Sequence, residues 1–129
     1  MFEIRPEHVQ AFDETARENF SQRACAHLRK TLPSQTASYA DEDLAARVRR
    51  DGERAVAYGL TWERSKVRFI EASLLLGPDF DHDPRYDWAG IMLRNREFGQ
   101  EQRSLALVMC AHQATQLDWK EEPDGRVSA

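Results

Sequence analysis

The sequence predicts an all-α protein of about five helices that form a single compact domain. Apolar residues recur every three or four positions along several segments, as they do on one face of an amphipathic helix. No segment alternates apolar and polar residues between turns, as a half-buried strand does. The chain has 129 residues, which is near the commonest size of one domain, and no repeat of fixed period divides it.

The first predicted helix begins at Pro6 and ends near Leu32. Proline suits the first turn of a helix, where an N–H has no partner within the helix, and Pro33 stops the helix at its other end. The apolar positions along one face are Val9, Phe12, Ala16, Phe20, Ala24, Leu28 and Leu32. The stretch PSQTASY that follows is predicted to be a polar connection.

The second predicted helix starts between Ala40 and Asp43 and ends before Gly59. Acidic residues in its first turn suit the helix dipole, and Gly59 stands where a left-handed cap belongs. Its apolar stripe is predicted to be Leu44, Val48, Ala55 and Val56. Its arginines, with Asp51 and Glu53 between them, are predicted to form a solvated face; they are Arg47, Arg49, Arg50 and Arg54.

The third predicted helix follows Thr61, which is a good N-cap, and ends at Gly77 and Pro78. Its apolar arc is the widest in the chain, so we expect it to be the central and most buried helix. The residues of this arc are Trp62, Val67, Phe69, Ile70, Leu74, Leu75 and Leu76.

Two further helices are predicted after the acidic loop. Asp83 and Pro84 provide an N-cap and a first-turn proline for a short fourth helix that closes at Asn95. The fifth helix runs from Gly99 or Gln100 to Leu117. One apolar face of it carries Leu105, Val108, Met109 and His112, with the histidine as a core residue. The helical domain therefore spans residues 1–118, and residues 119–129 are predicted to be a disordered tail.

Composition and charge exclude several classes of protein. A net charge of −4 and a pI near 5.6 do not favour a nucleic-acid partner. No stretch approaches the roughly 20 apolar residues of a membrane span, and the start, MFEIRPEHVQ, lacks the features of a secretion signal. Cys25 and Cys110 lie far apart in helical patterns, so we expect reduced thiols and a cytoplasmic protein.

The stretch GPDFDHDPRYDW, residues 77–88, holds the densest group of carboxylates and raises the question of a calcium loop. With Asp79 as the first ligand of an EF-hand, the required glycine is replaced by Pro84 and the closing glutamate by Gly90. The pattern instead indicates a helix stop, a loop pinned by Phe80 and a helix start. A metal-binding domain stays open as an alternative; its ligands would be Asp79, Asp81, His82 and Asp83.

The sequence contains no motif of a known catalytic site. HExxH, GxSxG and a phosphate-binding glycine loop are all missing, and no histidine has a second ligand three or four residues further along the same helix. The third helix is too apolar to enter a major groove as the second half of a helix-turn-helix. We therefore predict no catalytic residue, no cofactor and no enzymatic activity.

Residues 58–84 carry a pattern of caps and turns that covers about a fifth of the chain. Its elements are Tyr58-Gly59-Leu60, Glu63, Gly77, Phe80-Asp81 and Asp83-Pro84. In this pattern the chain resembles a group of small helical bacterial proteins that are encoded beside type VI secretion effector genes. The resemblance implies a binding protein for a cognate secreted effector, either an immunity protein or an effector chaperone.

The expected partner-binding surface is the acidic loop with its neighbouring aromatics. Aromatic residues anchor protein interfaces well, and the loop carboxylates are expected to be exposed. The predicted contacts are Asp79, Asp81, Tyr86 and Asp87. The chain is expected to be a monomer or a homodimer. A second alternative function is a self-associating module that packs through the small residues around Gly52.

Overall fold

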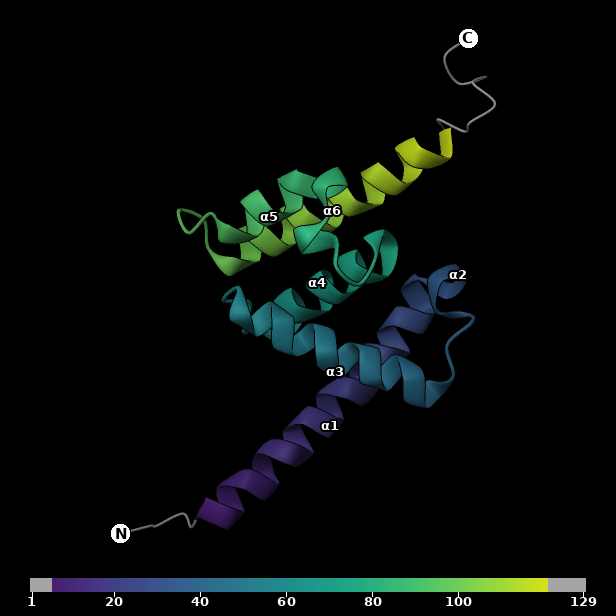
Figure 1. Cartoon of the computed structure of the whole chain (residues 1–129). Coiled ribbons are helices and arrows are strands. Elements are labelled where there is room, and N and C mark those ends of the chain that lie inside the picture. Colours follow the sequence, from purple (N-terminus) through teal and green to yellow (C-terminus); the bar gives the residue numbers. More distant parts are fainter. Residues whose placement is uncertain (1–5, 121–129) are drawn as a thin grey trace. The chain divides into compact units, whose positions relative to one another are not determined.

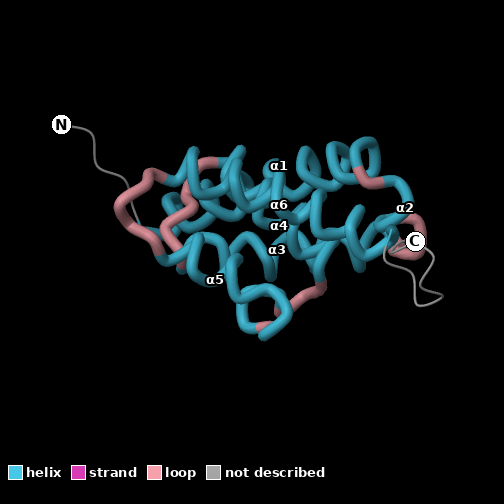
Figure 2. Tube along the Cα trace, turned by 90° about the horizontal axis from the view of Figure 1, so that it is seen from above, coloured by secondary structure: helices cyan, strands magenta, loops and turns pink. Residues whose placement is uncertain are grey.

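The computed structural model describes residues 6–120, and the predicted all-α fold is confirmed for this range, which contains no strand (Figures 1 and 2). Its elements in chain order are α1 (Pro6–Thr31), α2 (Pro33–Thr36), α3 (Asp41–Ala57), α4 (Glu63–Leu76), the 3-10 turns η1 (Phe80–His82) and η2 (Pro84–Tyr86), α5 (Asp87–Arg94) and α6 (Gln100–Lys120). None of these helices is both long enough and apolar enough to cross a membrane.

Contacts divide the chain into two units, Met1–Arg50 and Asp51–Ala129, and α3 contributes residues to both.

The last described helix, α6, continues to Lys120, three residues beyond its predicted end. Residues 121–129, which hold most of the predicted disordered tail, lie outside the described range. Cys25 and Cys110 are both free and half-buried, as expected for reduced thiols.

The first unit differs from the prediction in the segment after α1. Pro33 ends α1, but Pro33 then occupies the first turn of α2, so part of the predicted polar connection is helical. The Thr36 hydroxyl donates to the carbonyl of Leu32 at 2.8 Å. The guanidinium of Arg29 donates to the carbonyls of Thr36 and Tyr39 and to the carboxylate of Asp41. One arginine therefore ties the end of α1 to the turn and to the start of α3.

The core of the second unit lies where α4 packs against α6, so α4 is the central helix of this unit, in line with its wide apolar arc. Phe69 of α4 contacts Tyr58 and Phe80, with ring centroids 5.9 and 5.1 Å apart. The fully enclosed part of this core consists of Ala55, Leu60, Phe69, Ala72, Leu76, Phe80, Ala89, Leu93, Leu107 and Ala111. Two predicted members of the apolar stripes, Val56 and Trp62, are exposed instead.

The predicted N-cap of α4 is wrong. Trp62 is the N-cap, and neither its side chain nor that of Thr61 caps the helix. The side chain of Gln100, 38 positions further along the chain, accepts hydrogen bonds from the backbone N–H groups of Thr61 and Trp62, both at 2.8 Å. Its amide nitrogen donates to the Thr61 hydroxyl at 3.1 Å. The start of α6 therefore satisfies the free N–H groups that precede α4.

The predicted apolar face of α6 is also mostly wrong. Val108 is buried, but Leu105 and Met109 are exposed. His112 lies at the surface, with Nε2 3.7 Å from a carboxylate oxygen of Glu71. The face that packs inward consists of Arg103, Ser104, Leu107, Val108 and Ala111. Because this buried face includes the polar residues Arg103 and Ser104, it is rotated by part of a turn from the face that the apolar residues alone indicate.

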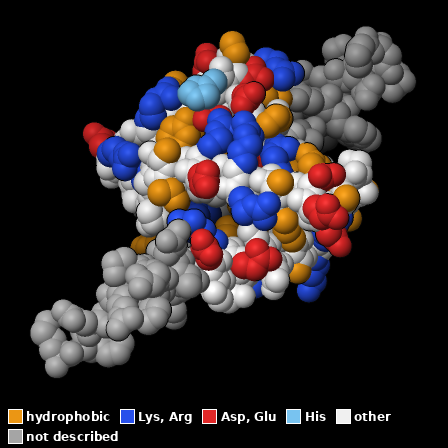
Figure 3. Space-filling view, turned by 60° about the horizontal axis from the view of Figure 1, so that its bottom comes forward, with side chains coloured by type: hydrophobic (Ala, Val, Ile, Leu, Met, Phe, Trp, Pro, Cys, Tyr) orange, Lys and Arg blue, Asp and Glu red, His pale blue; other side chains and the backbone are white. Residues whose placement is uncertain are grey.

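Charged side chains of both signs are intermixed on the surface, as Figure 3 shows for one face of the molecule. In α3 the predicted solvated face holds only in part. Arg49 and Arg50 are exposed, but Asp51 is fully buried and Arg54 is largely covered. Arg54 is covered because it contacts the acidic loop, and its Nη1 lies 4.0 Å from the buried Asp51.

Candidate functional site

The acidic loop of residues 77–88 folds as a helix stop, a pinned loop and a helix start, as predicted. Gly77 ends α4 with a φ of +123°, a conformation that favours glycine. Phe80 is buried in the core and pins the loop. Asp83 accepts a hydrogen bond from the backbone N–H of Arg85 at 2.9 Å, so it caps the short turn η2, and α5 itself begins at Asp87.

Asp81 is not the exposed contact that the sequence predicts, because it is only 6% exposed. Its carboxylate forms an ion pair with Arg54 of α3 and accepts a hydrogen bond from the hydroxyl of Tyr58 at 2.6 Å. Arg54 also donates to the carbonyl of Pro78, and its Nη1 lies 3.8 Å from Asp79. Asp81 is therefore the inner anchor of the loop, and Arg54 is the residue that holds it there.

The protonation of this cluster follows from its contacts. Burial raises the pKa of Asp81, but the hydrogen bonds from Tyr58 and Arg54 outweigh it and bring that pKa below its ordinary value. Burial and the hydrogen bond to Asp81 raise the pKa of Tyr58 to about 12. At neutral pH the cluster is therefore a carboxylate held by a guanidinium and a neutral phenol, which is a structural latch.

The other predicted contacts differ in their accessibility. Asp79 and Asp87 are exposed. Tyr86 is half-buried and packs against the core, and its ring lies 6.2 Å from that of Trp88, edge to face. Arg85 lies over the Tyr86 ring, with its guanidinium carbon 5.2 Å from the ring centroid. The loop thus presents two exposed carboxylates, while its aromatic side chain packs within the protein.

The geometry does not favour the metal-binding alternative. In the part of the chain that the structure describes, no group of three His, Cys, Asp or Glu side chains is placed to hold a metal ion. Asp81 is turned inward to Arg54 and Tyr58, and Asp83 is paired with Arg85. The alternation of carboxylates along the sequence therefore does not bring them to one point.

A surface groove of about 550 Å³ lies between α5 and α6. Its rim includes Ile91 and Phe98, which are 64% and 50% exposed. Its lining, which defines what we call the α5–α6 groove, is Trp88, Ile91, Met92, Asn95, Phe98, Gln102, Arg103 and Ala106. A hollow of this size lined by apolar and aromatic side chains is typical of a binding site.

Arg103 is the charged residue of the groove lining, and it is only 5% exposed. Its Nη1 donates to the carbonyls of Tyr58 and Leu93, both at 2.7 Å, and its Nε donates to that of Phe98 at 3.0 Å. Arg103 therefore caps the ends of α3 and α5 and holds the loop that carries Phe98. The groove owes its form to this residue.

Sequence patterns missed the groove because they assign apolar residues to the core. The segment WAGIML of α5 has more apolar residues than one buried face requires, and this excess is the signal that could have indicated a second apolar surface. For Arg54 and Arg103 local patterns give little signal, because Arg54 bonds Pro78 and Asp81, 24 and 27 residues away, and Arg103 bonds Tyr58, 45 residues away.

Comparison of the chain with profiles of known protein families, with curated protein sequences and with solved structures finds no match.

Proposed function

We propose that this chain is a non-enzymatic protein-binding module and that the α5–α6 groove is its binding surface. The observation that carries the proposal is the exposure of Ile91 and Phe98 at the rim of an apolar groove. Burying a side chain of this kind at an interface contributes about 1.5 to 3 kcal/mol. The groove lining contains no carboxylate, histidine, cysteine or hydroxyl group, so it offers binding and no acid, base or nucleophile.

The proposed partner is a cognate secreted effector of a type VI secretion locus, and the proposed place of binding is the cytoplasm. The motif of residues 58–84 supports this choice through the resemblance described above. In the structure most of this motif forms caps and the latch of the acidic loop. We therefore propose that it maintains the fold and that the partner contacts the groove, with the exposed Asp79 and Asp87 at the periphery.

Capture of the effector encoded beside the gene tests the proposal. The tagged full-length chain should retain this effector, and Ile91→Asp and Phe98→Asp should each raise the dissociation constant by about tenfold or more. Val56→Asp is the matched control, because Val56 is 47% exposed on α3 and does not line the groove. Each variant should keep the melting temperature of the wild type within a few degrees.

Three results would contradict the proposal. Equal retention by wild type and both groove variants would remove the groove from the interface. Equal loss with Val56→Asp would show a general effect of added charge. A dimer by light scattering that Ile91→Asp dissociates would show that a second copy occupies the groove. If the effector is captured, its toxicity in cells with and without this chain separates immunity from escort.

A further inference from the structure

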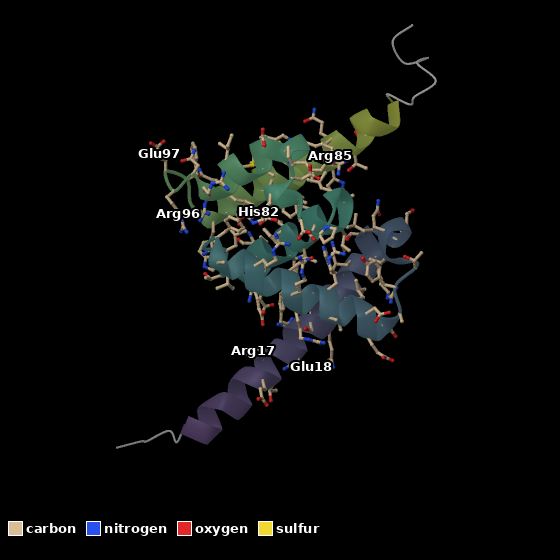
Figure 4. All side chains as sticks on the ribbon, in the orientation of Figure 1. Arg17, Glu18, His82, Arg85, Arg96 and Glu97 are labelled. Carbon is tan, nitrogen blue, oxygen red and sulfur yellow. The ribbon has the colours of Figure 1, made fainter. Side chains whose placement is uncertain are left out.

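Two arginines meet at the turn between α3 and α4. A Cβ atom on Gly59 would lie 2.6 Å from Nη1 of Arg96 and 3.4 Å from Nη2 of Arg103. The two guanidinium groups therefore converge on one point above the Tyr58–Gly59 turn. Figure 4 shows Arg96 on the connection between α5 and α6, next to Glu97. Gly59 itself has a φ of +84°, which favours glycine and leaves this point free of a side chain.

The positive charge at this point is not neutralised by any carboxylate that the structure describes. Among the described side chains, those of residues 14–116, neither Arg96 nor Arg103 has a carboxylate at ion-pair distance, Glu97 included. Burial and the charge of Arg96 both lower the pKa of Arg103. Arg103 also lies in the first turn of α6, where the helix dipole disfavours a cation. Three unfavourable electrostatic effects therefore coincide at one buried guanidinium.

A purely structural role explains Arg103 only in part. Its Nε and Nη1 groups donate to three carbonyls, which lie at the end of α3, at the end of α5 and in the loop between α5 and α6. Its Nη2 has no acceptor among the described residues, and no buried side-chain nitrogen there lacks a partner, so Nη2 is open to solvent. The exposed Arg96 likewise has no hydrogen-bond acceptor in the described range, yet its guanidinium lies beside a like charge.

We propose that Arg96 and Arg103 form an oxyanion site at the end of the α5–α6 groove, and that it receives a carboxylate of the protein that occupies the groove. This inference rests on the proposed function. Guanidinium groups match carboxylates in geometry, and a carboxylate between the two would offset their repulsion. Because Arg103 contacts Phe98, the anion and the apolar groove are adjacent. The fitting partner segment carries an aspartate or glutamate next to apolar side chains.

Nuclear magnetic resonance with sodium acetate and sodium phosphate as probes tests the site on the full chain. At constant ionic strength, the Arg96 Nε–Hε signal and the Gly59 amide should shift to saturation with acetate. Arg96→Gln should raise the midpoint by about fivefold or more. Arg85→Gln is the control, because Arg85 is also exposed but pairs with Asp83 and lies elsewhere in this unit (Figure 4). It should leave the midpoint unchanged.

The outcomes distinguish specific binding of a carboxylate at this site from general electrostatic screening and from a failure of the proposed function. If the chemical shifts of Arg85 and Arg96 change linearly and equally with anion concentration, the effect is general screening, and the proposed site is contradicted. Saturation with phosphate and not with acetate overturns the assignment of a carboxylate. In the effector assay, Arg96→Gln should weaken capture about fivefold. Unchanged capture by Arg96→Gln, with loss in Ile91→Asp, would overturn this inference and leave the proposed function intact.

Discussion

At the scale of single residues, the loop is organised by one buried carboxylate. Asp81 is enclosed between Arg54 and Tyr58, while Asp79, two residues earlier, is exposed. A buried carboxylate without its partners is strongly unfavourable, so the three side chains depend on one another. The alternating sequence DFDHD therefore contains side chains with opposite roles: Phe80 and Asp81 face inward, and Asp79 and His82 face solvent.

Asp81→Asn should destabilise the fold. The amide keeps the shape of the side chain but removes the charge that pairs with Arg54, which is mostly covered. We expect the free energy of unfolding to fall by about 2 to 3 kcal/mol, measured by urea unfolding with circular dichroism. Asp79→Asn is the control and should change it by less than about 0.5 kcal/mol. Equal effects of the two substitutions would show that Asp81 is not an anchor.

At the scale of elements, helix ends in the second unit are satisfied by residues that are distant in sequence. Arg103 of α6 caps α3 and α5, and Gln100 of α6 caps the start of α4. The first turn of α6 is thus a shared capping element for three other helices. Thr61, the local capping signal, does not cap α4, because the packing of α6 on α4 brings Gln100 within hydrogen-bond distance of the N–H groups there.

Gln100→Ala should weaken the start of α4. It leaves the N–H groups of Thr61 and Trp62 without their acceptor. The free energy of unfolding should fall by about 1 kcal/mol, the usual effect of losing an N-cap. Gln113→Ala, at an exposed position of the same helix, is the matched control and should be neutral or slightly stabilising. Equal stability of the two variants would show that Gln100 does not act as a cap.

At the scale of the whole molecule, the second unit carries an apolar groove, and Arg103 of its lining converges with Arg96 above Gly59. The chain carries a net charge of −4, yet neither Arg96 nor Arg103 has a carboxylate partner among the described side chains. Exposed apolar side chains and arginines without a described carboxylate partner are features that stability alone does not require.

The stability of the whole chain should decrease in acid. The pKa of Asp81 lies below its ordinary value, since the hydrogen bonds from Tyr58 and Arg54 outweigh burial, and the hydrogen bonds from Arg85 lower that of Asp83. The same aspartates bind protons more readily in the unfolded chain, where their pKa values are higher. The stabilisation is therefore complete above about pH 5 and is lost as the pH falls through the pKa values of the folded state. Urea unfolding at pH values from about 7 down to 2 measures it. Asp81→Asn should show a shallower decline, and an equal slope would contradict this assignment.

The sequence by itself determined the helical class, the order of the long helices and the form of the acidic loop. Those features depend on short-range physics: apolar periodicity, a proline or glycine at a helix end, and the cap at Asp83. Tertiary structure alone decided which side chains are exposed. Asp81 is buried because Arg54 lies 27 positions away in sequence and beside it in space, and Ile91 is exposed because Leu93 and Ala89 fill the core side of α5. Periodicity shows that a helix has an apolar face; only packing decides which apolar and charged residues remain for a partner.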